Sequence, residues 1–151
     1  MFNDNEAAKS LPINQIIRIF SVNNPSVLLA ILFSPLNIDT RVELTEPTGI
    51  LQAATIAIGE GVKVSPHKHN PVERLTMGTS ESWVVMNGSI KLDLFDLDSS
   101  FIQSWILNRG AIAVTEKGGH GLTSLQSNTL VYEFKNGPYW GPDVDKLQIK
   151  H

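Results

Sequence analysis

The sequence predicts an all-β protein, a sandwich or a barrel, and two observations support this prediction. Short segments rich in Ile, Val, Leu and Thr recur along the chain, separated by clusters of Gly, Pro, Asn and Asp. Helical periodicity is weak throughout, whereas short strands between frequent turn signals are typical of sandwiches and barrels. In chain order, the expected strands cover residues 16–22, 27–33, 41–45, 52–58, 63–67, 82–86, 90–96, 104–107, 111–115, 121–124 and 129–135.

The chain has the size of one domain. Its 151 residues, 42% of them hydrophobic, match a domain that buries roughly 70% of its unfolded surface. No repeat, linker or low-complexity tract divides the sequence. We therefore expect a flexible N-terminus over residues 1–10 and a single domain over residues 11–151.

Charge and composition argue against several classes of protein. The formal net charge is −3 with a pI of about 5.7, and no run of Lys or Arg forms the basic patch that nucleic acids require. The chain has no cysteine, which excludes disulfides, thiolate metal sites and cysteine nucleophiles. The start of the chain lacks the features of a signal peptide, and the longest apolar run, residues 27–33, is far shorter than the roughly 20 residues that span a bilayer. We expect a cytoplasmic protein without nucleic-acid or membrane partners.

The pair Asn87 and Gly88 predicts a β-hairpin between residues 83–86 and 90–94, because both residues tolerate the positive φ of a type I′ turn. Side chains alternate between the two faces of a strand. If Glu81 faces the interior, Trp83 and Val85 face it too.

The same alternation sends Val84 and Met86 to the outer face of their strand. An exposed apolar face on a protein usually marks an interface. Either the extra N-terminal strands or a second copy of the chain would cover it, and we expect a homodimer.

The spacing of His67, His69, Glu81 and His120 predicts a metal site. Residues two apart in a strand point the same way, so His67 and His69 can present both imidazoles to one point. A carboxylate from the next strand and a histidine from further along the chain complete a set of three nitrogens and one oxygen. This set suits a divalent metal ion, namely Zn, Fe, Ni, Mn or Cu, and leaves coordination positions for water or a substrate.

These residues resemble the first motif of the cupin superfamily. Gly61 precedes His67 by five intervening residues, His69 follows, and Glu81 precedes Gly88 by six intervening residues. The resemblance implies a cupin jelly-roll β-barrel, here with extra N-terminal strands, and a metal ion bound by the histidines and the carboxylate.

Two carboxylates compete for the ligand role. The motif places a glutamate three or four residues after the histidine pair, which selects Glu73, and six residues before the glycine, which selects Glu81. An insertion of eight residues would explain both spacings. We assign the role to Glu81 because of the expected hairpin, with Glu73 as the alternative.

A second cupin motif can be recognised, but it departs further from the family pattern than the first motif does. Gly110 begins it, Glu116 stands where the motif has proline, and His120 arrives one residue early. A glycine turn tolerates such a change, so His120 remains the fourth expected ligand. The remaining histidine, His151, is terminal and expected to be disordered.

Residues 66–146 most resemble small cupin-fold metalloproteins associated with O-antigen and other surface-polysaccharide biosynthesis. The matching stretches are residues 80–83, 94–96 and 133–139. This resemblance implies a metal-binding protein near sugar metabolism, without defining a reaction.

The function expected first is an isomerase or epimerase in which the metal polarises a carbonyl or hydroxyl of a small, oxygen-rich molecule such as a sugar or nucleotide sugar. Glu73, Glu133 and Tyr139 are the candidates for moving the proton. Glu133 is either an outward charge or an acid in the pocket, and Tyr139 either stacks on a sugar ring or seals the core. An iron-dependent dioxygenase and a non-catalytic, metal-dependent binder remain alternatives.

Overall fold

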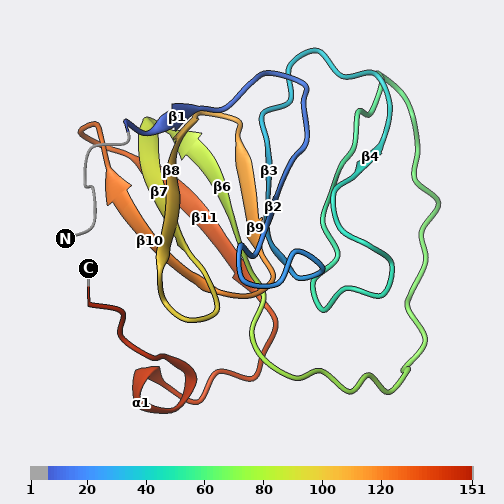
Figure 1. The fold of residues 1–151 in the computed structure, drawn as a ribbon. Helices are drawn as coiled ribbons and strands as arrows, with labels where there is room; N and C mark the ends of the chain where they lie inside the picture. The colour runs from blue at the N-terminus through green and yellow to red at the C-terminus, as the bar shows by residue number, and fades with distance from the viewer. Residues whose placement is uncertain (1–6, 151) are drawn as a thin grey trace.

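The structure is a computed structural model that describes residues 7–150. It consists of two facing β-sheets and a short two-stranded ribbon, which confirms the all-β class (Figure 1). The four-stranded sheet contains, in spatial order, β1 (Lys9–Ser10), β8 (Phe101–Asn108), β7 (Ser89–Phe95) and β10 (Gly119–Ser124). The five-stranded sheet contains β11 (Leu130–Lys135), β6 (Glu81–Asn87), β9 (Ile112–Thr115), β3 (Leu28–Phe33) and β2 (Ile17–Phe20). The ribbon pairs β4 (Val42–Glu43) with β5 (Ala54–Thr55), and α1 (Pro142–Asp145) lies near the C-terminus.

The main core lies between the two sheets. Trp83 and Val85 on β6 are 2% and 0% exposed and pack with Leu92 and Leu94 of β7. The inward orientation of Trp83 and Val85 that alternation predicted is therefore confirmed, and Glu81 is buried beside them. Apolar burial of this kind is the main favourable contribution to folding.

The outer face of the five-stranded sheet is covered only in part. Over β3 and β9, the residues Ile31, Phe33 and Val114 pack against Leu44 from the segment that carries the ribbon. Over β6 and β11, Val84 is half-buried, and the apolar side chains that stay exposed are Met86, Leu130, Tyr132 and Phe134. Residues from the N-terminal third thus cover only part of the face on which the sequence placed Met86.

The predicted hairpin at Asn87 and Gly88 is wrong. β6 pairs with β9 and β11, whereas β7 pairs with β8 and β10, so the turn carries the chain from one sheet to the other. Gly88 does adopt a positive φ of 72°, and a Cβ there would lie 2.5 Å from Thr129 Oγ1. Glycine is required because the corner is both left-handed and tight.

The strand expected over residues 63–67 does not form. Every residue from 58 to 79 is exposed, and this stretch has no strand or helix. Alternating Val and polar residues favour a strand, but a strand also needs a neighbour to accept its backbone hydrogen bonds. Among residues 7–150, no strand pairs with this stretch.

At the N-terminus, Lys9 and Ser10 form β1 alongside β8, although the sequence placed them in a flexible segment. The first six residues of that segment lie outside the described residues, as does His151. No helix within residues 7–150 is long and apolar enough to cross a membrane.

Asp96, at the end of β7, ties the two sheets together. Its carboxylate accepts hydrogen bonds from the backbone N–H groups of Val22, Asn23 and Leu97, at 2.7, 3.2 and 2.7 Å. Val22 and Asn23 follow β2 in the five-stranded sheet, so one side chain joins loops from both sheets. Burial raises the pKa of Asp96, but the hydrogen bonds from Ser21 and these N–H groups outweigh it and hold the pKa below its usual value.

We predict that Asp96→Ala lowers the free energy of unfolding at pH 7 by about 2 kcal/mol, because several N–H groups lose a charged acceptor. The lowered pKa means that this stabilisation is present above the usual aspartate value of 3.8 and is lost as the pH falls through the folded-state pKa. Urea unfolding at pH 7 and below pH 4 measures the difference. Asp98→Ala, in the same turn, is the control and should cost less. An equal loss in both variants would contradict the role given to Asp96.

Candidate functional site

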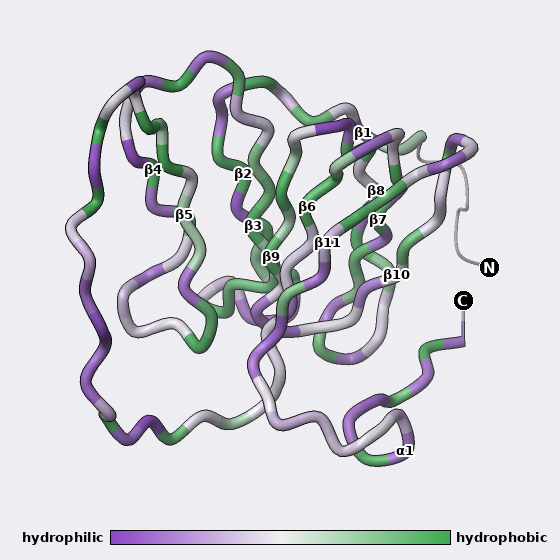
Figure 2. Tube along the Cα trace, turned by 180° about the vertical axis from the view of Figure 1, so that it is seen from behind, coloured by the Kyte–Doolittle hydropathy of each residue, from purple (hydrophilic) through white to green (hydrophobic). Residues whose placement is uncertain are grey.

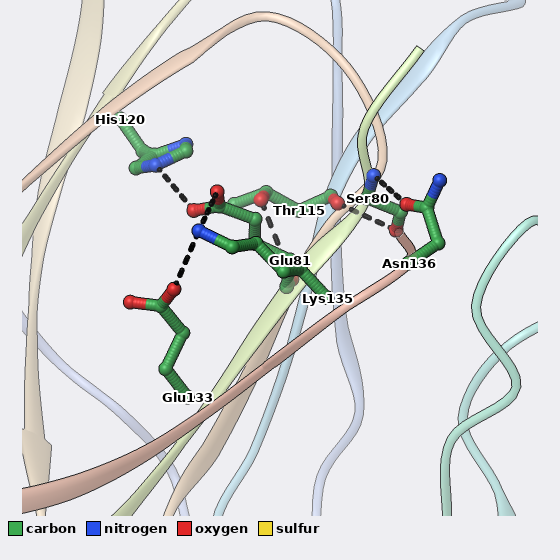
Figure 3. A network of polar contacts seen from close by, with 7 residues as sticks. All are labelled: Ser80, Glu81, Thr115, His120, Glu133, Lys135 and Asn136. Atoms are coloured by element: carbon green, nitrogen blue, oxygen red, sulfur yellow. Dashed lines mark hydrogen bonds and ion pairs between the residues drawn. The ribbon is translucent and has the colours of Figure 1, made fainter. Parts of the chain in front are cut away.

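A cavity of about 840 Å³ opens between the sheets on the side of β10 and β11. Residues of β6, β10 and β11 line it together with the C-terminal segment 144–149. Its volume falls within the range of small-molecule sites, roughly 300–1,000 Å³. Polar side chains from three strands meet there, as Figure 3 shows.

The central contact joins Glu81 on β6 to His120 on β10. His120 Nε2 lies 3.1 Å from Glu81 Oε2, so the pair spans the two sheets. His120 faces inward because it lies opposite Leu94, a core residue of β7. Its ring also meets the ring of Trp83 edge to face, with centroids 4.6 Å apart, which fixes the plane of the imidazole.

Lys135 on β11 is the third member of this cluster. Its Nζ lies 3.6 Å from Glu81 Oε1 and 2.9 Å from Glu133 Oε1, and 4.4 Å from the ring centroid of Tyr139. The register explains the contacts, because Lys135 pairs with Glu81 and Glu133 pairs with the inward-facing Trp83. Glu133 therefore belongs to the cavity, which settles the two readings of its orientation.

Ser80, which precedes Glu81, and Asn136, which follows Lys135, form hydrogen bonds that hold the cluster in place. Asn136 accepts a hydrogen bond from the Ser80 N–H at 2.8 Å and donates one to the Gly78 carbonyl at 3.1 Å. The Ser80 hydroxyl donates to the Thr115 carbonyl at 2.8 Å. These bonds anchor the start of β6, and with it Glu81, against β9 and the end of β11 (Figure 3).

The pKa shifts indicate that His120 is a neutral base and that Glu133 and Lys135 form an ion pair beside it. Burial lowers the pKa of His120, and the Glu81 carboxylate partly offsets this effect. The Lys135 ammonium lowers the pKa of Glu133, and Glu133 in turn raises the pKa of Lys135. At neutral pH the imidazole is uncharged, which is the form that binds a metal or accepts a proton.

The four expected metal ligands lie in two separate pairs. Glu81 and His120 meet in the cavity, whereas His67 and His69 lie in the exposed segment with ring centroids 5.3 Å apart. Within residues 7–150, no three His, Asp or Glu side chains are arranged to hold a metal ion. The donors present in the cavity suit a divalent metal, but they are half of the expected set, so the fit is incomplete as described.

The candidate catalytic residues are also divided between the cavity and the exposed segment. Glu133 and Tyr139 line the cavity, whereas Glu73 lies in the exposed segment with the two histidines. Tyr139 is 46% exposed and Trp140 is 72% exposed, so these rings do not seal the core. Sequence analysis missed Lys135, although its spacing of two from Glu133 would have placed both on one face.

No family model matches the chain, and no curated protein or solved structure matches it significantly. The cupin resemblance therefore depends on its motifs alone.

We predict that Glu81→Gln lowers the pKa of His120 further, because the carboxylate charge that favours the imidazolium is removed. Nuclear magnetic resonance titration of the imidazole in the presence of a chelator measures the change. Glu116→Gln is the matched control, since Glu116 contacts Ser80 and not the imidazole. A rise in the His120 pKa in Glu81→Gln would contradict the described contact.

Proposed function

We propose that the protein binds a small, oxygen-rich molecule of the sugar or nucleotide-sugar class in this cavity and isomerises or epimerises it at a divalent metal. The proposed architecture is a cupin jelly roll, whose barrel would be completed by the segment that carries His67 and His69. The observation that supports this proposal best is the contact between the buried Glu81 and the partly exposed His120 at the cavity.

The cavity offers the groups that a hydroxylated ligand needs. Glu133 and Asp145 supply carboxylate acceptors and Lys146 an ammonium donor along its wall. Tyr139 and Trp83 provide aromatic surface, and aromatic rings pack on the apolar faces of sugar rings. Small-molecule sites typically combine apolar surface with a small number of polar groups in fixed positions.

The metal part of the proposal starts from Glu81 and His120. His67 and His69 would add two imidazoles once their segment lies along the cavity. A bound divalent ion would polarise a carbonyl or hydroxyl of the ligand. Imidazole must be neutral to bind a metal, and the lowered pKa of His120 favours that form.

Side chains outside the proposed ligand set would move the proton. Glu133 has a lowered pKa because of Lys135, so it is a carboxylate at neutral pH and can accept a proton. Tyr139, whose ring lies against the Lys135 ammonium, is placed to act as its partner. General acid–base catalysis of this kind contributes roughly 10²–10⁴ in rate. Glu73 would take part only if its segment moved to the cavity.

We predict that protein purified without chelators contains one divalent metal ion per chain by elemental analysis. Glu81→Ala, His120→Ala and the double variant His67→Ala/His69→Ala should lose it, because each removes donors from the set. Glu73→Ala should retain the metal and serves as the control. If Glu73→Ala loses the metal and Glu81→Ala keeps it, the carboxylate assignment is wrong.

We predict that the metal-loaded protein catalyses incorporation of solvent deuterium into a nucleotide sugar or a free hexose, detected by mass spectrometry. Glu133→Gln should lower the rate about 10²–10⁴-fold, since the base is lost, while metal content stays unchanged. Glu43→Gln, at an exposed position on β4, is the matched control. A loaded protein that binds these sugars without exchange would be a binder, and oxygen uptake with ferrous iron would indicate a dioxygenase instead.

A second candidate function needs no metal. The neutral His120 beside the Glu81 carboxylate is itself an acid–base pair, in which the carboxylate orients the imidazole and stabilises its protonated form. The 3.1 Å contact favours this candidate. Deuterium incorporation that survives complete chelation and disappears in His120→Gln would select it over the metal-dependent reaction.

A further inference from the structure

The segment that follows β11 forms one wall of the cavity. Residues 144–149 line it together with residues of β6, β10 and β11. After β11 the chain forms α1 and turns back toward the side of the molecule that carries β10 (Figure 1), and Figure 2 shows the same course from behind. We term residues 140–149 the C-terminal arm. The cavity is thus built from both sheets and from an arm that belongs to neither.

One apolar contact holds the arm against β10. Gly119 on β10 directly precedes His120, and it does not have the positive φ that favours glycine at Gly118. A Cβ at Gly119 would nevertheless overlap the Cδ1 methyl group of Ile149. What glycine provides at this position is therefore room for Ile149, because it allows a close approach to the backbone. The contact fixes the end of the arm next to His120.

The polar contacts of the arm, in contrast, are internal to it. Within residues 7–150, its hydrogen bonds join its own residues, such as the Trp140 N–H to the Asp145 carboxylate at 2.7 Å and the Lys146 N–H to the Pro142 carbonyl at 3.0 Å. Leu147, in the middle of the arm, is 87% exposed. Segments with few buried apolar contacts have low local stability, so the position of the arm depends on Ile149.

The arm brings a cation to the cavity. Of the residues that line it, Lys146 is the only lysine or arginine. Burial is the main cause that lowers the pKa of His120, and the Lys146 ammonium lowers it further. The hydrogen bond from Lys135 is the main cause that lowers the pKa of Glu133, and Lys146 adds to this effect as well. The charge of Lys146 thus acts on two groups of the site.

The carboxylates of the cavity already have partners. Three of the four lie within 3.6 Å of a lysine ammonium, and these are Glu81, Asp93 and Glu133. The fourth, Asp145, accepts the hydrogen bond from the Trp140 N–H. No ion pair of residues 7–150 includes Lys146. Its ammonium therefore has hydrogen-bonding capacity for an anion, and hydrogen bonds between two charged groups are among the strong ones.

We propose that the C-terminal arm is a ligand-binding element of the cavity, in which Lys146 binds an anionic group of the ligand, a phosphate or a carboxylate, and Ile149 positions the arm by its contact with Gly119. The part that concerns the sugar rests on the proposed function, since it selects phosphorylated or acidic sugars over neutral hexoses. The anion site itself requires neither the metal nor the reaction.

Binding of inorganic phosphate tests the anion site directly. Phosphate is titrated at constant ionic strength and followed by the nuclear magnetic resonance shifts of the backbone amides of Gly119 and the arm. Lys146→Gln should weaken the binding about tenfold, since a charge-assisted hydrogen bond is lost. Lys150→Gln, at an exposed position that does not line the cavity, is the matched control and should bind as the wild type does. No saturable binding, or equal losses in the two variants, would overturn the proposal.

Repeating the titration after chelation and dialysis separates this site from the proposed metal. An unchanged affinity supports Lys146 as the binding group, whereas phosphate binding that disappears with the metal would overturn the proposal. Glucose 6-phosphate, glucuronate and glucose then distinguish the sources of the anion. We expect the two anionic sugars to bind more tightly than glucose and to lose this advantage in Lys146→Gln. Glucose binding as tight as that of both would overturn the selection of an anionic ligand. If phosphate binds through Lys146 and no sugar binds, the anion site stands and the proposed function fails.

The positioning role of Ile149 has its own test, because the side chain carries no charge. Ile149→Ala should weaken phosphate binding about five- to tenfold, since a half-buried side chain loses three carbon atoms and the arm detaches more often. Ile149→Val should restore most of the affinity. Leu147→Ala is the matched control in the same arm and should leave the affinity unchanged, because Leu147 is 87% exposed. Wild-type affinity in Ile149→Ala, or an equal loss in Leu147→Ala, would overturn the positioning role.

Discussion

The arrangement of the site depends on one contact, the approach of Glu81 to His120 across the two sheets. A buried carboxylate is costly unless charged or hydrogen-bonding partners compensate it. Glu81 has two, His120 from the opposite sheet and Lys135 from the neighbouring strand. The contact forms only if the sheets keep their separation, which the packing of Trp83 against Leu92 and Leu94 maintains. The site therefore depends on the packing of the core.

Alternation along single strands was predictable from the sequence, because it follows from local backbone geometry. It predicted that Glu81, Trp83 and Val85 share one face of their strand, and all three are buried. The partner of a strand is a long-range property, and here local signals failed. Asn87 and Gly88 have the composition of a hairpin turn, yet their corner separates two sheets. Only Gly88 has the positive φ that a type I′ turn requires of both residues.

The expected metal ligands also show which features local sequence patterns can predict and which depend on long-range contacts. Spacing selected residue types that suit a metal, and two of them, Glu81 and His120, lie in contact although they are 39 positions apart in the sequence. It could not establish whether the strand of His67 and His69 has a neighbour, because that depends on residues far along the chain. Lys135 was missed for a related reason, since a lysine near the end of a strand usually marks a solvated charge. Its importance comes from the register of β11 against β6.

The position of the site at an open edge links its chemistry to assembly. The His120 side chain is 30% exposed, and it lies on β10, whose second edge pairs with no other strand of residues 7–150. A strand added at that edge would remove water from the Glu81–His120 contact and lower the effective dielectric around it. Electrostatic interactions strengthen as the dielectric falls, so the same addition would tighten the contact and increase the effect of burial on the imidazole. The strength of the contact between Glu81 and His120 therefore depends on what lies against β10.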